Sequence, residues 1–392
     1  MSLNATPSAE RTHIGFFGLR NAGKSSLVNA VTGQNLSVVS PQSGTTTDPV
    51  RKAMELLPLG PVLIIDTPGF DDEGPLGELR VRKTREVLEQ CDIAILVTEA
   101  GCPLAPAEEE LLRLFKERET PHLIVRNKCD LYPDASGDAL AVSALTGESV
   151  PALKEAIARL LPQERKKTRL VADLIRPGDL VVLVVPIDES APKGRLILPQ
   201  QQAIRDILEA GAVSVVSRDT ELQDALAALG KPPALVVTDS QVFRQVAAVV
   251  PAAVPLTSFS ILFARYKGYL DAAVRGVRAL EALPEGAHIL IAEGCTHHRQ
   301  CDDIGTVKLP HWIRGALGRD FRFSSCSGWE FPDDLGGVDL VIHCGGCMLN
   351  ERTVRARLRV AEARGLPFTN YGVAIAWAQG ILERCLLEGR LA

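Results

Sequence analysis

Residues 18–25, with the sequence GLRNAGKS, decide the fold of the first part of this chain. They follow the apolar run of residues 14–17 and precede a helical pattern, which is the strand–loop–helix context of a phosphate-binding loop. In such a loop the glycines let backbone N–H groups surround phosphates, a lysine adds charge at the β and γ oxygens, and a serine hydroxyl binds Mg²⁺. The stretch therefore predicts a nucleotide site at the edge of a parallel α/β sheet.

Four further motifs follow in the order expected of a guanine-nucleotide site. Residues 66–69 (DTPG) end an apolar run and would bring a carboxylate to Mg²⁺ and a glycine N–H to the γ-phosphate. Residues 127–130 (NKCD) follow another apolar run. The Asp130 carboxylate can accept hydrogen bonds from both N–H groups on the edge of guanine, and adenine cannot donate this pair of bonds. Residues 44–48 (GTTTD) fit a switch loop, and residues 143–145 (SAL) fit the loop over the base. The set predicts GTP as the ligand.

The predicted site residues fall into three groups. Lys24, Thr46 and Gly69 are expected to act in catalysis. Ser25, Thr46 and Asp66 are expected to hold Mg²⁺. The residues expected to contact the nucleotide are Gly18, Asn21, Gly23, Lys24, Ser25, Ser26, Thr46, Asp66, Gly69, Asn127, Lys128, Asp130, Ser143 and Ala144.

Length and composition set the broad class. A chain of 392 residues is too long for one ordinary core and predicts two or three domains. The chain has 43 Lys and Arg and 48 Asp and Glu, which gives a net charge of −5. It therefore lacks the overall positive charge that would predict nucleic-acid binding. The first residues lack a signal-peptide core and no apolar run is long enough to span a bilayer, so we expect a cytoplasmic protein.

The apolar pattern predicts an α/β protein of three domains, each with parallel strands that alternate with helices. A P-loop GTPase domain is expected at residues 1–165 and ends at a charged linker near residues 162–169. Two smaller parallel-sheet domains are expected to follow, a dimerisation domain at residues 170–265 and a further domain at residues 266–392, to which the family resemblance given below assigns the binding of an iron–sulfur cluster. The middle domain carries no cysteine and no catalytic motif, so its default role is binding or oligomerisation.

Cysteine and histidine residues gather near the C-terminus. They form two motifs, Cys295-Thr296-His297 and His343-Cys344-Gly345-Gly346-Cys347, and each motif lies at or just past the end of a predicted strand. Three thiolates with nearby histidines favour a metal, and their spacing fits both a closed zinc site and a [4Fe-4S] cluster with one open iron. The isolated cysteines are expected to be ordinary core residues; these are Cys91, Cys102, Cys129 and Cys385.

Residues 12–161 resemble the translation-factor-like GTPases of the TrmE/Era group, on the five motifs quoted above. Asn21 matches the asparagine that helps to hold K⁺ against the phosphates in potassium-dependent members. Phe70 stands where Ras-like switches carry a water-orienting glutamine, and a phenylalanine cannot orient water by hydrogen bonding. The resemblance therefore implies slow intrinsic hydrolysis that K⁺, dimerisation or a partner would assist.

The combination of a GTPase domain, a middle α/β domain and the two cysteine motifs resembles the HydF family of [FeFe]-hydrogenase maturation GTPases. That resemblance implies a [4Fe-4S] cluster on Cys295, Cys344 and Cys347, with His297 and His343 as conditional ligands. It also implies a scaffold that receives a diiron precursor from the radical-SAM maturases HydE and HydG and delivers it to the hydrogenase HydA. A homodimer or higher homo-oligomer is expected, without membrane or nucleic-acid partners.

Two other functions stay open on the sequence. One is an RNA-modification or ribosome-assembly GTPase with a structural zinc site, which would show salt-sensitive RNA binding. The other is a redox-regulated GTPase switch, whose hydrolysis rate would change with oxidation of its cluster.

Overall fold

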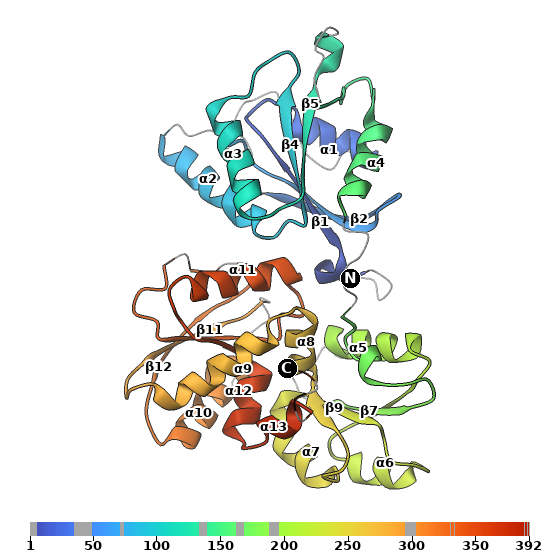
Figure 1. Cartoon of the computed structure of the whole chain (residues 1–392), viewed down its shortest axis with the longest axis vertical. Coiled ribbons are helices and arrows are strands. Elements are labelled where there is room, and N and C mark those ends of the chain that lie inside the picture. The colour runs from blue at the N-terminus through green and yellow to red at the C-terminus, as the bar shows by residue number, and fades with distance from the viewer. Residues whose placement is uncertain are drawn as a thin grey trace. The chain divides into compact units, whose positions relative to one another are not determined.

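The computed structural model describes residues 6–34, 49–70, 74–132, 139–161, 168–187, 196–294, 303–329, 331–332, 334–387, 389 and 391. The chain divides into two compact units, Met1–Arg165 and Lys166–Ala392 (Figure 1). Within the described ranges, no helix is both long enough and apolar enough to cross a membrane.

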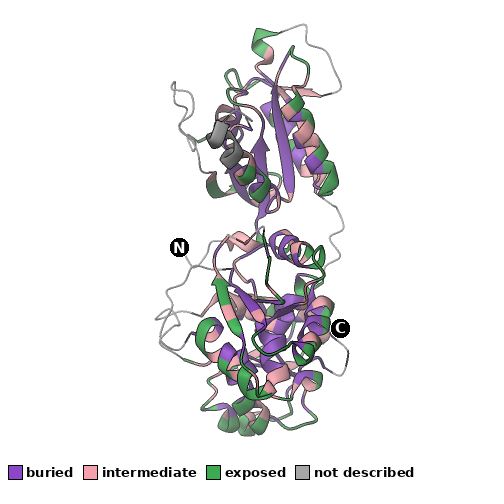
Figure 2. Ribbon diagram, turned by 90° about the vertical axis from the view of Figure 1, so that its left-hand side faces the viewer, coloured by how far each residue is buried: buried purple, intermediate pink, exposed green. Residues whose placement is uncertain are grey.

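The first unit is built on a six-stranded sheet in the order β2-β3-β1-β4-β5-β6. Strands β1 and β4 consist of largely apolar residues buried along almost their whole length, as a sheet covered by helices on both faces requires (Figure 2). The strands are β1 (Thr12–Phe17), β2 (Val50–Leu56), β3 (Gly60–Asp66), β4 (Ile93–Glu99), β5 (His122–Asn127) and β6 (Leu140–Ala141).

This sheet is mixed, whereas the sequence predicted a parallel one. Strand β2 pairs antiparallel with β3, while the other pairs of strands in this sheet are parallel. The sequence of β2, VRKAMEL, is largely exposed at the edge and lacks the continuous apolar run of a buried strand. An exposed edge strand therefore gave too little signal to be predicted.

Helices connect the parallel strands of the first unit. Helix α3 begins at Pro106, whose fixed φ suits the first helical position, and its Glu108 carboxylate accepts the N–H of Ala105 at 3.0 Å. The helices are α1 (Lys24–Thr32), α2 (Gly74–Leu88), α3 (Pro106–Glu117) and α4 (Val150–Leu160), with short 3₁₀ turns η1 (Ser8–Glu10) and η2 (Cys129–Leu131).

The second unit contains two four-stranded sheets that are wholly parallel. The first has the order β10-β9-β7-β8. Its strands are β7 (Leu180–Val184), β8 (Val213–Ser217), β9 (Leu235–Thr238) and β10 (Leu256–Ser258). Its helices are α5 (Leu198–Glu209), α6 (Leu222–Ala228) and α7 (Phe243–Val249), with η3 (Ala172–Leu174) and η4 (Ser240–Val242).

The other sheet has the order β12-β11-β13-β14. Its strands are β11 (His288–Ala292), β12 (Arg322–Cys326), β13 (Leu340–His343) and β14 (Phe368–Asn370). The remaining helices are α8 (Phe259–Tyr266), α9 (Leu270–Arg278), α10 (Leu309–Leu317), α11 (Glu351–Glu362), α12 (Tyr371–Ala378) and α13 (Leu382–Cys385), with η5 (Ala279–Ala282) and the π-helical turn η6 (Ile304–Lys308).

The two sheets of the second unit share one hydrophobic core. The same cluster of buried residues contains Val181 of β7 and Leu235 of β9 together with Ile291 of β11 and Val341 of β13. Polar contacts at Ser260 on α8 reinforce this packing. Its carbonyl accepts the side-chain amide of Asn370 at 2.9 Å, and its hydroxyl accepts the N–H of Gly372 at 3.2 Å. A displacement of one sheet would therefore disturb the packing of the other.

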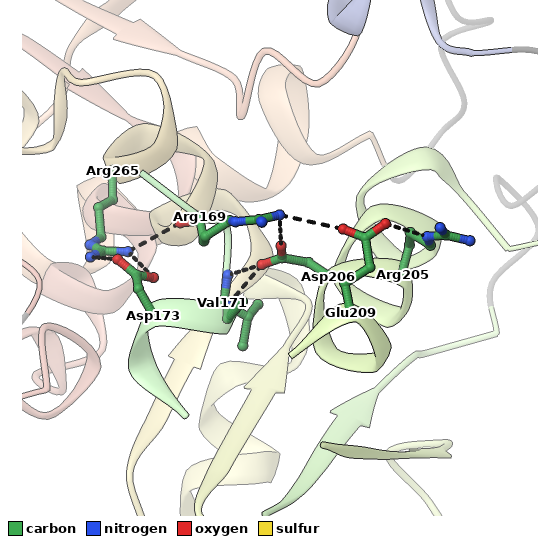
Figure 3. A network of polar contacts seen from close by, with 8 residues as sticks. Arg169, Val171, Asp173, Arg205, Asp206, Glu209 and Arg265 are labelled. Atoms are coloured by element: carbon green, nitrogen blue, oxygen red, sulfur yellow. Dashed lines mark hydrogen bonds and ion pairs between the residues drawn. The ribbon is translucent and has the colours of Figure 1, made fainter. Parts of the chain in front are cut away.

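A polar network fixes the start of the second unit (Figure 3). The carboxylate of Asp206 on α5 accepts the N–H groups of Val171 at 2.7 Å and of Ala172 at 2.8 Å. Arg265 on α8 forms an ion pair with Asp173 at 2.5 Å. These contacts anchor the first residues after the charged linker to two helices of the unit.

The four isolated cysteines differ in burial. Cys91 and Cys385 are buried, Cys129 is half-buried and Cys102 is exposed. The expectation of a core position is wrong for Cys102 because it lies in a turn between β4 and α3, where its neighbours Gly101 and Pro103 are exposed as well.

Candidate functional site

The phosphate-binding loop lies between the end of β1 and the start of α1. Gly23 has a φ of 88°, and a Cβ there would come within 2.2 Å of the Asn127 amide nitrogen, so only glycine fits. Asn21 adopts a φ of 63°, a left-handed conformation in which asparagine is enriched. The ammonium of Lys24 donates to the carbonyls of Gly18 at 3.0 Å and Leu19 at 2.8 Å. The Lys24 side chain thus folds back across the phosphate-binding loop and binds two of the loop's backbone carbonyls.

The end of β3 faces the first turn of α1. The hydroxyl of Ser25 donates to Oδ2 of Asp66 at 2.6 Å. The other carboxylate oxygen, Oδ1, is buried and has no hydrogen-bond partner among the described residues. A buried carboxylate beside a hydroxyl is a donor set that suits Mg²⁺, which prefers oxygen ligands. The residues present therefore fit a divalent cation at this position.

The segment after Asp66 returns to the phosphate loop. The N–H of Phe70 donates to the carbonyl of Gly18 at 3.2 Å, which places Gly69 beside that loop. The Phe70 ring is 1% exposed and packs in the apolar cluster of Leu63, Ile65 and Phe17. It therefore faces the core in this conformation. Ser26 lies half-buried in the first turn of α1, and Thr46 with its GTTTD motif lies outside the described residues.

Asn127 at the end of β5 joins the phosphate loop to the loop after β6. Its amide nitrogen donates to the carbonyl of Ala22 at 3.0 Å, and its Oδ1 accepts the N–H of Ala144 at 3.1 Å. The Ser143 hydroxyl accepts the N–H of Thr146 at 3.1 Å and so shapes that loop. The three predicted motifs are therefore brought together by one buried side chain.

Lys128 and Asp130, the other two residues of this motif that were predicted to contact the nucleotide, differ in their surroundings. Lys128 has a φ of 64°, and its ammonium pairs with Glu99 at 2.7 Å. The hydrogen bond from that ammonium is the main cause that lowers the pKa of Glu99. Asp130 is exposed, as a carboxylate that binds an entering base must be.

Cys344 and Cys347 lie on the turn that follows β13. The sulfur of Cys344 accepts the N–H of Gly294 at 3.0 Å and of Gly346 at 3.3 Å. Such bonds stabilise a thiolate, so the turn fits a metal bound through sulfur. Burial nevertheless raises the pKa of Cys344, and burial followed by the neighbouring Cys344 raises the pKa of Cys347 to about 11. Without a metal both groups are therefore thiols at neutral pH.

His343, the last residue of β13, is fully buried beside the turn. One ring nitrogen, Nδ1, contacts the carbonyl of Cys344 at 2.7 Å, and Nε2 contacts the guanidinium of Arg357 at 3.1 Å. Since the guanidinium can only donate, Nε2 accepts and Nδ1 carries the proton. Burial, then Arg357, lowers the pKa of His343 to about 3. Both nitrogens are thus engaged in the described conformation.

Sequence reasoning missed several buried polar residues around this turn. Lys267 donates to the carbonyl oxygens of Gly346 and, at 2.5 Å, Leu349. The hydroxyl of Tyr371 donates to the carboxylate of Glu293 at 3.0 Å. No local motif marks Lys267, Arg357 or Tyr371, because each comes from a different helix region and reaches the turn only through the fold.

Cys295, His297 and His298 lie outside the described residues, although Gly294, the residue before Cys295, contacts the Cys344 sulfur. Among the described residues alone, no group of three or more His, Cys, Asp or Glu side chains is arranged to hold a metal ion. The described part of the site thus consists of the Cys344–Cys347 turn and the strand end that leads into Cys295.

Comparison with protein families separates the chain into three matches. Residues 13–128 match the 50S ribosome-binding GTPase model. Residues 170–268 match the hydrogen maturase F dimerization domain, and residues 271–388 match the hydrogen maturase F tetramerization domain. The chain belongs to the hydrogen maturase F family. It carries a P-loop GTPase domain followed by the dimerization and tetramerization domains of that family.

Curated relatives are similar to the GTPase part of this hydrogen maturase F chain. GTPase Era of Carboxydothermus hydrogenoformans is 32% identical over 165 residues, which cover 38% of this chain and 55% of the relative. The tRNA modification GTPase MnmE of Roseiflexus is 33% identical over 163 residues, 37% of this chain and 35% of the relative. The chain therefore spans between about a third and about half the length of these two relatives.

Among solved structures, a variant of Aquifex aeolicus Era bound to GDP·AlF₄⁻ matches with a TM-score of 0.34 and 20% identity, over 61% of this chain and 97% of that one.

Proposed function

We propose that this hydrogen maturase F chain is a GTPase scaffold that holds a [4Fe-4S] cluster and delivers a diiron precursor to an [FeFe]-hydrogenase. One observation carries the proposal. The Cys344–Cys347 turn and the strand end that leads into Cys295 meet at the Cys344 sulfur, within the part of the chain that matches the hydrogen maturase F tetramerization domain.

At the nucleotide site, backbone N–H groups around Gly23 would surround the phosphates, helped by the N-terminus of α1. Lys24 would exchange its two carbonyl acceptors for β- and γ-phosphate oxygens, since a carbonyl is a weaker partner for an ammonium than a phosphate is. Asp130 would accept the two N–H groups of guanine. Gly69 would offer its N–H to the γ-phosphate, so its nearness to the phosphate loop supports this role.

Ser25 and Asp66 would hold Mg²⁺ with Thr46. When bound, Mg²⁺ supplies positive charge against the phosphate oxygens. The buried Oδ1 of Asp66 supports the assignment, because an unsatisfied buried oxygen costs free energy that a cation would recover.

Hydrolysis is proposed to be slow and stimulated by K⁺. Phe70 is buried in the apolar core and cannot orient a water molecule. Asn21, held with its backbone in the left-handed region of the phosphate loop, would offer its side-chain oxygen to K⁺. Replacing K⁺ by Na⁺ should therefore lower the rate in the wild type and have little effect in Asn21→Ala.

Cys295, Cys344 and Cys347 would bind three irons of the cluster, which when bound leaves one iron for an exchangeable ligand. His343 would position this turn through its contacts with Cys344 and Arg357, and His297 would stand as a conditional ligand. Residues 1–165, 170–265 and 266–392 would act as GTPase, dimerisation and cluster-binding domains.

The diiron precursor is the cargo of this scaffold. We propose that it arrives from the radical-SAM maturases HydE and HydG and passes to HydA. A γ-phosphate contact with Thr46 and Gly69 would give GTP a different affinity for two arrangements of the chain, as a switch requires.

Anaerobic reconstitution of the full chain with iron and sulfide tests the proposal. We expect about four irons per chain and the EPR signal of a reduced [4Fe-4S] cluster in the wild type. Cys344→Ala should lose both, whereas the matched control Cys102→Ala, at the exposed cysteine, should keep both. Stoichiometric zinc without that signal would instead support a GTPase with a structural metal site.

A further inference from the structure

Two buried cations contact the segment that runs from His343 through Leu349. Lys267 is 2% exposed and Arg357 is 3% exposed. Side chains of these types are almost never so deeply buried unless a specific interaction compensates for the loss of water. Their location beside the cysteine turn therefore needs a physical reason.

Lys267 holds the backbone of the turn. It directly follows α8, and its ammonium donates to the carbonyl oxygens of Gly346 and Leu349, which lie before and after Cys347 in the chain. The ammonium also lies 5.4 Å from the centre of the Phe263 ring. The lysine therefore lies against the backbone on both sides of a proposed ligand.

Arg357 holds the strand end and the loop beside it. Its guanidinium contacts Nε2 of His343 at 3.1 Å and donates to the carbonyl of Gly328 at 2.6 Å. It is 5.3 Å from the centre of the Phe331 ring. Because His343 precedes Cys344, this contact fixes the direction in which the chain enters the turn.

Both charged groups contact residues that adjoin the cysteines. The Lys267 ammonium donates to the carbonyl of Gly346, which precedes Cys347, and the Arg357 guanidinium contacts His343, which precedes Cys344. Charges interact far more strongly in a buried site than in water. Iron bound through thiolates would introduce negative charge at the place that these two cations face.

We propose that Lys267 and Arg357 are positioning residues that hold the Cys344–Cys347 turn and supply the positive charge against which an anionic iron–sulfur cluster is retained and reduced. This inference rests on the cluster of the proposed function. Reduction by an external one-electron donor, here dithionite, adds one electron and one negative charge to the site while no bond to these residues forms or breaks. Nearby cations therefore favour the reduced form.

Lys267 gives the inference a second consequence. It lies within residues 170–268, which match the dimerization domain, whereas the turn belongs to the tetramerization domain. One charged side chain thus joins the segment that matches the dimerization domain to the turn in the segment that matches the tetramerization domain.

The test compares charge-removing with charge-keeping substitutions in the full chain. Lys267→Met and Arg357→Gln remove the charge, and Lys267→Arg and Arg357→Lys keep it. Arg364→Gln, at an exposed arginine just beyond α11, makes the same change in net charge away from the turn. After anaerobic reconstitution, we would measure iron content, the midpoint potential by EPR-monitored titration with dithionite, and thermal unfolding.

We expect both neutral variants to bind less iron and to show a more negative midpoint potential. The ratio of reduced to oxidised cluster at a fixed potential should fall at least tenfold, which is about 59 mV for a one-electron couple. The charge-keeping variants should stay within half of that shift, and Arg364→Gln should match the wild type. A folded Lys267→Met that binds no cluster, beside a Lys267→Arg that does, would also support the inference.

Three outcomes would overturn it. An unchanged midpoint potential in both neutral variants would leave the proposed function standing and remove only the charge role. Equal loss of iron in charge-removing and charge-keeping variants would show that shape alone matters. A wild type without any iron–sulfur signal would refute the proposed function itself, and this inference with it.

Discussion

Asn127 donates a hydrogen bond to the carbonyl of Ala22 at 3.0 Å, although the two residues lie 105 positions apart in the chain. The same side chain accepts the N–H of Ala144 at 3.1 Å. The guanine motif therefore supports the phosphate loop and the loop over the base at once, and the three cannot be treated as independent contacts.

Asn127→Ala should weaken nucleotide binding by releasing the two loops that its side chain holds together. It removes two buried hydrogen bonds of about 1 kcal/mol each and leaves their partners without an acceptor or donor. We expect GTP and GDP affinity to fall together by about tenfold to a hundredfold, measured by titration calorimetry. Gln223→Ala, an exposed amide on α6, serves as the control. Loss of GTP binding alone would contradict this account.

Asp130→Asn should change which base is bound. A carboxylate accepts two N–H groups of guanine, whereas an amide presents one donor and one acceptor. We expect GTP affinity to fall by at least about tenfold, since a hydrogen bond to a charged group contributes about 1.5–3 kcal/mol. Xanthosine triphosphate, which has an oxygen in place of the guanine amino group, should bind the variant better than GTP.

The competition of GTP and xanthosine triphosphate for the purified chain measures this change. Asp224→Asn, an exposed carboxylate in the second unit, should leave the preference for GTP intact. An unaltered preference in Asp130→Asn would place the base elsewhere.

The sequence predicted the buried strands of the GTPase unit well because β1 and β4 are continuous apolar runs. It did not predict β2, whose charged residues are exposed, nor the three-residue strands β10 and β14, which are too short to show a period. The spacing of Cys344 and Cys347 in the sequence was enough to predict that they share one turn. The roles of Lys267 and Arg357 could not be predicted, because only the packing of distant helices brings them there.

The buried carboxyl group of Glu108 should make the free energy of unfolding depend on pH. Burial is the main cause that raises the pKa of its carboxyl group above 4.5, against the lowering effects of its bond to Ala105 and of Arg126 and Lys24. The folded state thus binds this proton more tightly than the unfolded state. The contribution of this proton to the free energy of unfolding is fully present below the pKa that Glu108 has in the unfolded chain. It is lost as the pH rises through the pKa that Glu108 has in the folded chain.

Glu108→Gln keeps an oxygen for the N–H of Ala105 but carries no charge. We expect the variant to gain stability relative to the wild type as the pH rises from about 4 to about 7.5. Glu108→Ala, which cannot titrate either, should follow the same trend but remain about 1 kcal/mol less stable than Glu108→Gln, because it loses the cap. Urea unfolding across that range measures both. A Glu108→Gln difference that does not vary with pH would contradict the assignment.

Val216→Lys should reduce self-association. Strand β8 lies at the edge of its sheet, and Val213 and Val216 are 48% and 45% exposed within the match to the dimerization domain. An exposed edge with apolar side chains is a template for pairing with another chain, and a lysine on such an edge opposes it. We expect sedimentation analysis to show a smaller assembly, with the affinity between chains lowered by at least about tenfold, or about 1.4 kcal/mol. Leu57→Lys, at a leucine 81% exposed in the GTPase unit, should leave the assembly unchanged. If Val216→Lys sediments like the wild type, the dimer contact lies on another face of this domain.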